Sequence, residues 1–236
     1  MPRVLFLANS PGADSGIGVA DRLRAMSVDV TIAQAYDGEF PVELSAFDAV
    51  YLTGSPHGAY DDIPWIHREH EVIRQFESLG VPILGVCFGS QILASALCGR
   101  GEIFRRPTCE VGYVSLPLTT DAAEDPLLRG LASPIRMFVW HNDEVRADHP
   151  RMRILATSHD CPNHVWRYGD RAVWGIQGHP EVTRAVAPAW LVKNRAALEH
   201  DGGDVQSLLR DRGADDAVDF ILPNFIDIVS GIVAAR

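Results

Sequence analysis

The chain has 236 residues, of which 47% are hydrophobic, and it carries a formal net charge of −10 at pH 7. A chain of this length can bury a substantial core, so we expect a single domain over residues 1–236. The acidic balance argues against a nucleic-acid partner, because the 21 Lys and Arg are outnumbered by 31 Asp and Glu and leave no excess to neutralise phosphates.

The first third of the chain alternates between strand-like and helix-like patterns. Short apolar runs predict strands over residues 3–8, 28–35, 47–54 and 81–86. Helical spacing predicts helices over residues 18–26 and 66–80, the second ending at Gly80. The first apolar run is too short for a signal peptide, and no run reaches the roughly 18 residues that cross a bilayer. We therefore expect no membrane association and a cytoplasmic location.

The remainder of the chain changes character twice. Residues 102–177 contain short β-rich segments separated by turn residues, and the chain is mostly helical from Val182 onward, with a helical tail from about residue 201. Strands that alternate with helices are typical of an α/β domain. We expect one such domain with a central mixed sheet.

One cysteine lies where a predicted strand turns into a predicted helix, in the segment PILGVCFGSQ (residues 82–91). Gly85 and Gly89 flank Cys87 with the spacing of a nucleophile elbow, in which the turn is too tight for side chains beside the pivot. The helix N-terminus that follows is one of the settings that favour a thiolate. Cys87 is therefore a candidate nucleophile.

The other cysteines and several histidines have simpler interpretations. Cys98, Cys109 and Cys161 form no C-x-x-C pair, so we expect neither a zinc site nor a disulfide framework, but unreactive thiols. Two residue pairs are weak metal candidates. We interpret the first, His67 and His70, as a solvated helix face, and the second, His159 and His164 around Cys161, as a hairpin turn.

The segment QGHPEV (residues 177–182) contains a candidate base. Pro180 restricts His179 to an extended backbone, and side chains two apart on an extended segment point to the same side. Glu181 can then orient the imidazole of His179. The same residues also make a good helix start, with Pro and Glu in the first turn. The two interpretations are compatible.

Together, GVCFGSQ and, about ninety residues later, GHPE resemble the class I, triad-type glutamine amidotransferases over roughly residues 46–185. The segments TGSPHGAYDDIPWI, EVGY and VWHNDEV stand between or before them in the order expected of stand-alone members. The resemblance implies a flavodoxin-like three-layer α/β fold with a mostly parallel sheet. It implies a Cys87–His179–Glu181 triad, an oxyanion hole from the backbone N–H groups of Gly54 and Phe88, and substrate-binding positions at Ser55, Gln91, Glu110, His141 and Asp143.

Members of this family usually have an aromatic residue directly before the histidine, where this chain has Gly178. We expect that difference to widen the pocket or to loosen His179.

The resemblance implies hydrolysis of the γ-amide bond of glutamine or a γ-glutamyl compound through a cysteinyl thioester, with no metal and no cofactor. No phosphate-binding G-x-x-x-x-G-K-[ST] loop occurs. Three alternatives stay open: a glutaminase that supplies ammonia to a separate synthetase, an independent hydrolase of γ-glutamyl amides or peptides, and a binding or regulatory protein of the same fold without turnover.

Overall fold

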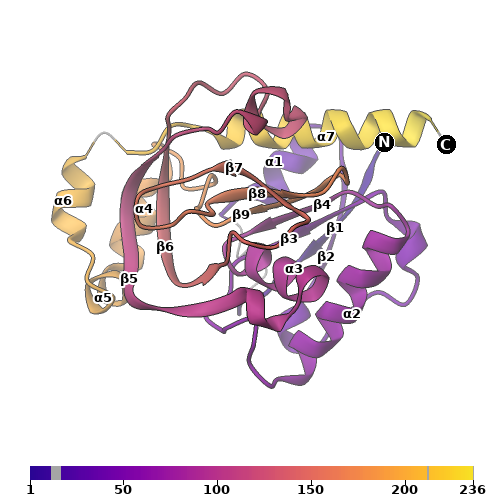
Figure 1. Ribbon diagram of the computed structural model, residues 1–236, viewed down its shortest axis with the longest axis horizontal. Helices are drawn as coiled ribbons and strands as arrows, with labels where there is room; N and C mark the ends of the chain where they lie inside the picture. Colours follow the sequence, from indigo (N-terminus) through magenta and orange to yellow (C-terminus); the bar gives the residue numbers. More distant parts are fainter. Residues whose placement is uncertain (12–16, 212, 236) are drawn as a thin grey trace.

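The computed structural model describes residues 1–11, 17–211 and 213–235, and its centre is a seven-stranded sheet in the order β2-β1-β3-β4-β9-β8-β7 (Figure 1). β8 (Val165–Tyr168) pairs antiparallel with both of its neighbours, β9 and the edge strand β7 (Met152–Ala156). The other five strands are parallel: β1 (Arg3–Leu7), β2 (Asp29–Ala33), β3 (Ala49–Leu52), β4 (Ile83–Val86) and β9 (Val173–Ile176). The predicted mixed, mostly parallel sheet is confirmed.

Helices cover both faces of this sheet. Side chains alternate along a strand, so Val4 and Phe6 of β1 face one core, which includes α1 (Val19–Ala25) and α7 (Val218–Ala234). Leu5 and Leu7 face the other core, which includes α2 (Pro64–Ser78) and α3 (Phe88–Cys98). The result is the three-layer, flavodoxin-like arrangement that the sequence predicts (Figure 1).

Two long strands form a separate antiparallel sheet, which the sequence did not distinguish from the central one. β5 (Ile103–Leu116) pairs with β6 (Ile135–Val145), and the register shifts between Arg105 and Glu110. The backbone N–H of His179 donates to the carbonyl of Phe138 in β6 at 2.7 Å. This sheet therefore holds the loop that follows β9.

The helical end of the chain is confirmed, although its first helix begins only at Ala187. It contains α4 (Ala187–Lys193), α5 (Arg195–His200), α6 (Val205–Arg210) and α7. Single 3₁₀ turns connect other elements: η1 (Ala35–Asp37), η2 (Leu44–Ala46), η3 (Arg100–Glu102), η4 (Asp121–Glu124) and η5 (Pro126–Leu128). Across the described ranges, no helix combines the length and apolarity needed to span a membrane.

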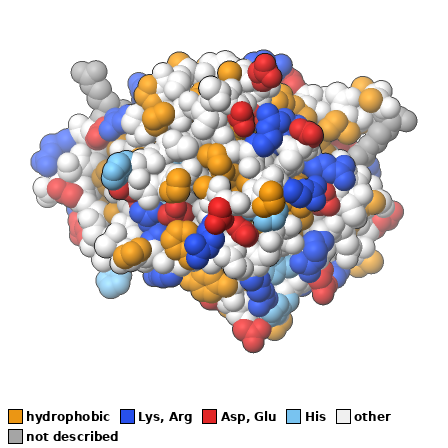
Figure 2. Space-filling view, in the orientation of Figure 1, with side chains coloured by type: hydrophobic (Ala, Val, Ile, Leu, Met, Phe, Trp, Pro, Cys, Tyr) orange, Lys and Arg blue, Asp and Glu red, His pale blue; other side chains and the backbone are white. Residues whose placement is uncertain are grey.

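Charged side chains of both signs are mixed on the surface shown in Figure 2, and α2 buries a histidine that was expected to be exposed. On the face in Figure 2, acidic and basic side chains are interspersed, so the net negative charge does not form one continuous patch there.

On α2, the predicted solvated face is wrong for His70, which is only 4% exposed. Burial, with Arg100 and Arg74, lowers the pKa of His70 to about 4. His67 is more exposed and contacts Asp62 and Arg100, each at 2.6 Å.

Candidate active site

Cys87 lies at a sharp turn between β4 and α3. Its backbone has φ 55° and ψ −115°, a conformation that non-glycine residues rarely adopt. A Cβ added at Gly85 would lie 2.3 Å from the carbonyl oxygen of Gly89, and one at Gly89 would lie 2.3 Å from that of Leu52. Only glycine fits at either position, as the elbow motif predicts.

His179 and Glu181 follow the end of β9, the strand beside β4. Nδ1 of His179 is 2.8 Å from Oε1 of Glu181, whose side chain is 4% exposed. The imidazole also interacts electrostatically with the Cys87 side chain. A Cβ added at Gly54 would lie 3.9 Å from Sγ of Cys87 and 3.8 Å from Cε1 of His179. The structure thus brings Cys87 and His179 together beside Gly54, with Glu181 on Nδ1 of His179.

The charges of this group favour an imidazolium. Burial by itself lowers the pKa of His179, but the Cys87 sulfur and the Glu181 carboxylate act against burial and raise that pKa well above its ordinary value. A protonated His179 between two acidic groups can stabilise a thiolate on one side and donate a proton to a leaving group on the other.

Two backbone N–H groups beside the sulfur are free to bind an oxyanion. Phe88 is the first residue of α3, so its N–H has no intrahelical partner. Within the part of the chain that the structure describes, the N–H groups of Phe88 and Gly54 donate to no other protein group. Free donors near a nucleophile are the requirement for stabilising a tetrahedral intermediate.

A cavity of about 420 Å³ opens at the sulfur. Four of the predicted substrate-binding residues line it: Ser55, Gln91, His141 and Asp143. The side-chain amide of Gln91 donates to the carbonyl of Asp143 at 2.9 Å. Glu110 is not among the lining residues; its Oε2 instead lies 2.8 Å from Nε2 of His141. Glu110 therefore acts on this cavity through His141.

Several cavity residues were not assigned by the sequence analysis, among them Arg105, Trp140, Trp190, Asn194 and Asp201. Arg105 and Trp140 come from the β5–β6 sheet, and the other three from the α4–α5 region. Trp140 lies in the segment VWHNDEV but was not singled out there. No local motif marks the other four, since a tryptophan on a short helix, such as Trp190, is equally typical of a core.

The space beside Gly178 is already filled. A Cβ there would lie 2.6 Å from Sδ of Met137 and 3.2 Å from the carbonyl oxygen of Phe138. The ring of His179 lies beside those of Phe138 and Trp190, with centroid distances of 6.3 and 6.4 Å. Met137 therefore occupies the space that a wider pocket would need, contrary to that expectation. A looser His179 stays a prediction.

The predicted hairpin around Cys161 is confirmed, since residues 157–164 join the antiparallel strands β7 and β8. His159 is exposed, but Cys161 and His164 are buried beside His141, and one N or S atom of each lies within 4.8 Å of the others. These are the donor types that bind zinc. Of the three, only His141 lines the cavity, and its nitrogens already contact Glu110 and the carbonyl of Asp143.

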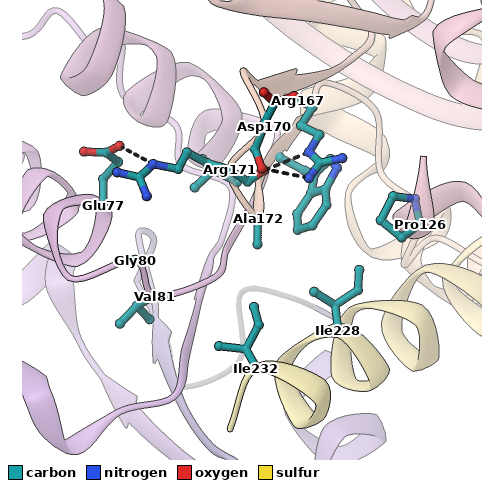
Figure 3. Close-up of a pocket in the computed structure, with 12 residues that line it drawn as sticks. Glu77, Gly80, Val81, Pro126, Arg167, Asp170, Arg171, Ala172, Ile228 and Ile232 are labelled. Carbon is teal, nitrogen blue, oxygen red and sulfur yellow. Dashed lines mark hydrogen bonds and ion pairs between the residues drawn. The ribbon is translucent and has the colours of Figure 1, made fainter. Parts of the chain in front are cut away.

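A second cavity, of about 300 Å³, lies at the opposite edge of the sheet, where β4 and β9 begin (Figure 3). Ile228 and Ile232 of α7 form one wall. Arg171 pairs with Glu77 at 3.2 Å, and Arg167 donates to the backbone carbonyls of Arg171 and Asp170. It contains no nucleophile, so the cavity at Cys87 is the candidate active site.

Known proteins resemble the chain in sequence and in structure. The family model "Glutamine amidotransferase class-I" matches residues 17–197. One subunit of the glutamine-hydrolyzing GMP synthase of Haloarcula marismortui is 34% identical over 163 residues, which are 68% of this chain and 76% of that protein. Gamma-glutamyl peptidase 3 of Arabidopsis thaliana is 31% identical over 159 residues, 64% of this chain and 61% of the peptidase. A crystal structure of a glutamine amidotransferase from Thermotoga maritima aligns with a TM-score of 0.82 and 25% identity, covering 97% of each chain.

The share of each GMP synthase relative's length that this chain matches differs between relatives. The match covers 77% of the corresponding synthase subunit from Sulfolobus acidocaldarius but only 42% of the GMP synthase from Porphyromonas gingivalis.

Proposed function

Because the chain belongs to the class-I glutamine amidotransferase family, we propose that it hydrolyses the γ-amide bond of glutamine or a γ-glutamyl compound through a thioester on Cys87. The observation that carries this proposal is the position of His179, which lies with Cys87 beside Gly54 and whose Nδ1 is 2.8 Å from Oε1 of Glu181. A nucleophile, a base and a group that orients the base are the parts that acyl transfer requires.

The reaction has two steps. The thiolate of Cys87 attacks the γ-carbonyl carbon, and the N–H groups of Gly54 and Phe88 stabilise the oxyanion. The C–N bond then breaks as His179 gives its proton to the departing nitrogen, which leaves as ammonia or an amine. In the second step, His179 takes a proton from water, which attacks the thioester, releases glutamate and regenerates Cys87. One oxyanion donor is typically worth about 10²- to 10³-fold in rate, so the two N–H groups are central to the proposal.

The glutamyl half fits the polar side of the cavity. Asp143 has the negative charge needed for an α-ammonium group, and Arg105, 3.6 Å from that carboxylate, has the positive charge needed for an α-carboxylate. Gln91 and His141 hydrogen-bond to the backbone carbonyl of Asp143 and so fix its position.

A second candidate is a glutaminase that supplies ammonia to a separate synthetase in the cytoplasm. It is favoured by the relatives whose names describe them as one subunit of a GMP synthase, because such a protein works with a second chain. In that case, addition of the synthetase should raise the rate of glutamate release from glutamine.

The experiment that tests the proposal follows glutamate release from glutamine and γ-glutamyl amides, with mass spectrometry of the protein after rapid acid quench. We expect a covalent γ-glutamyl adduct on Cys87, and loss of both adduct and glutamate in Cys87→Ser. Cys98→Ser is the matched control, because burial raises the pKa of that thiol to about 12 and keeps it protonated. If no donor gave glutamate or an adduct, the chain would be a binding protein of this fold.

A further inference from the structure

The cavity continues past the sulfur on the side of His179. The ring of His179 lies 6.4 Å from that of Trp190, and Trp190 packs edge to face against Trp140 at 5.8 Å. His179 delivers the proton to the departing nitrogen, so the amine half of a donor has to lie on this side. Ammonia needs no space there. Two indole rings beside the leaving group instead suit a larger amine.

An acidic residue stands at the far end of these rings. The indole N–H of Trp140 donates to Oδ2 of Asp201 at 2.7 Å, and Asp201 lines the cavity together with Asn194. The backbone carbonyl of the same Trp140 is 3.8 Å from Sγ of Cys87. A single tryptophan residue therefore spans the distance between the nucleophile and this carboxylate.

The two carboxylates of the cavity differ in their partners. Asp143 receives a hydrogen bond from Tyr60 at 2.9 Å and has Arg105 at 3.6 Å. Among the residues whose positions are described, no Lys, Arg or His pairs with Asp201. A half-buried carboxylate with an indole N–H on one oxygen and no ion pair to a described side chain is a site for a positively charged group.

We propose that Trp140, Trp190, Asn194 and Asp201 form a binding site for the amine half of the donor, and that it selects γ-glutamyl amides of amines that carry a second, positively charged group. This inference rests on the proposed function. An ammonium group there gains an ion pair with Asp201 and a cation–π contact with the indole rings. An amine that ends in a carboxylate, as in a γ-glutamyl peptide, would meet Asp201 as a like charge. A linear diamine fits this chemistry, and hydrolysis then yields glutamate and the free diamine.

Three donors of matched length test this site: γ-glutamylcadaverine, γ-glutamyl-n-pentylamine and γ-glutamyl-δ-aminovalerate, whose amine halves end in a cation, a methyl group and an anion. We expect kcat/KM to fall in that order, with about tenfold between cation and methyl, the usual size of a hydrogen-bonded charge contact. Glutamine should be a poorer donor than the cationic amide.

Asp201→Asn keeps an acceptor for the indole N–H of Trp140 but removes the charge. It should reduce the cation-to-methyl ratio of kcat/KM from about tenfold to near one. Glu199→Gln is the matched control: it removes a carboxylate from the adjoining turn of α5, outside the cavity, and should leave the ratio unchanged. Trp190→Leu should lower kcat/KM for both the cationic and the methyl donor relative to glutamine.

The results separate this proposal from the one it rests on. Equal rates for the three donors, or a ratio unchanged in Asp201→Asn, would overturn the amine site while glutamate release still supported the proposed function. Absence of glutamate and of a Cys87 adduct with every donor would overturn both.

Discussion

Cys87 occupies a backbone conformation that costs roughly 1–3 kcal/mol and persists only where its surroundings enforce it. The backbone N–H of Cys87 donates to the carbonyl of Ile176 in β9 at 2.8 Å, and the two flanking glycines let β4 pass directly into α3. The backbone around Cys87 therefore sets the position of its sulfur.

Gly89→Ala should strongly destabilise the fold. Its new methyl would lie 2.3 Å from the carbonyl oxygen and 2.7 Å from the carbonyl carbon of Leu52, and backbone in the centre of a sheet cannot move away cheaply. We expect a loss of at least about 3 kcal/mol in the free energy of unfolding, measured by chemical denaturation. Gly101→Ala, which has no atom within 4 Å of the added methyl, should change it by less than about 1 kcal/mol. Equal effects of the two would show that the turn is looser than the structure indicates.

Glu181→Gln should shift the pH dependence of hydrolysis. The Glu181 carboxylate is one of the two charges that raise the pKa of His179, so its removal lowers that pKa. The alkaline limb of kcat/KM, where His179 loses its proton, should then move to lower pH, and kcat at neutral pH should fall. The measurement is a pH profile of kcat/KM for the variant and the wild type. An alkaline limb that stays in place would assign it to a group other than His179.

Individual residues of the site could be predicted from the sequence where they lie close together in the chain. The glycine spacing around Cys87 and the two-residue spacing of His179 and Glu181 are visible in short segments. Trp190 and Asp201 reach the cavity only through the way α4 and α5 fold against the β5–β6 sheet, so no short segment could indicate them.

Helix α2 contains two buried titratable residues, Glu69 and His70, whose burial its polar sequence pattern did not predict. The side-chain amide of Asn9 donates to Oε1 of Glu69 at 3.0 Å, and the backbone N–H of Asn9 donates to Oγ1 of Thr53, the residue before Gly54. Glu69 is fully buried. This chain of contacts connects α2 to the loop that presents the Gly54 N–H.

Glu69→Gln should remove a pH dependence of stability. Burial raises the pKa of Glu69 from 4.5 to about 8, with the Asn9 hydrogen bond acting against it. Between about pH 4.5 and about pH 8 the folded chain therefore holds a proton that the unfolded chain has lost. Stability from this group is greatest below the unfolded pKa and falls as the pH rises through the folded one.

The measurement is the free energy of unfolding of wild type and Glu69→Gln across this pH range. The difference between the two should change by several kcal/mol in favour of the variant as the pH rises, since one pKa unit corresponds to about 1.4 kcal/mol. His70, whose pKa burial lowers to about 4, titrates in both proteins and cancels in the difference. A constant difference across the range would mean that Glu69 is ionised in the folded chain.

Element types could be predicted from periodicity, but strand partners could not. The apolar runs at residues 3–8 and 81–86 and the β-rich middle all correspond to observed strands. The segments of β5 and β6 belong to the same β-rich stretch of the chain as β7, β8 and β9, yet they form their own sheet. Which strands pair depends on contacts between distant segments, and single-segment patterns do not contain that information.

The whole molecule assembles the site by placing β4 beside β9. Both strands run parallel, so Cys87 after β4 and His179 after β9 emerge at the same edge, while the cavity of Figure 3 lies at the other. Helix α7 packs against one face of the sheet and supports this arrangement, because Phe225 packs edge to face on Trp174 of β9 at 6.3 Å. Helix α7 is thus part of the core that holds β9, the strand before His179.

Phe225→Ala tests this role of α7. The side chain is fully buried among residues of the core that includes Trp174 and Ile221, so its removal leaves a cavity in the layer beneath β9. We expect a loss of about 3–5 kcal/mol in the free energy of unfolding, the usual range for a buried phenylalanine. Phe220→Ala, in the same helix but 46% exposed, should cost less than about 1 kcal/mol. If instead both variants unfolded like the wild type, α7 would be dispensable for the fold and β9 would be held by the sheet alone.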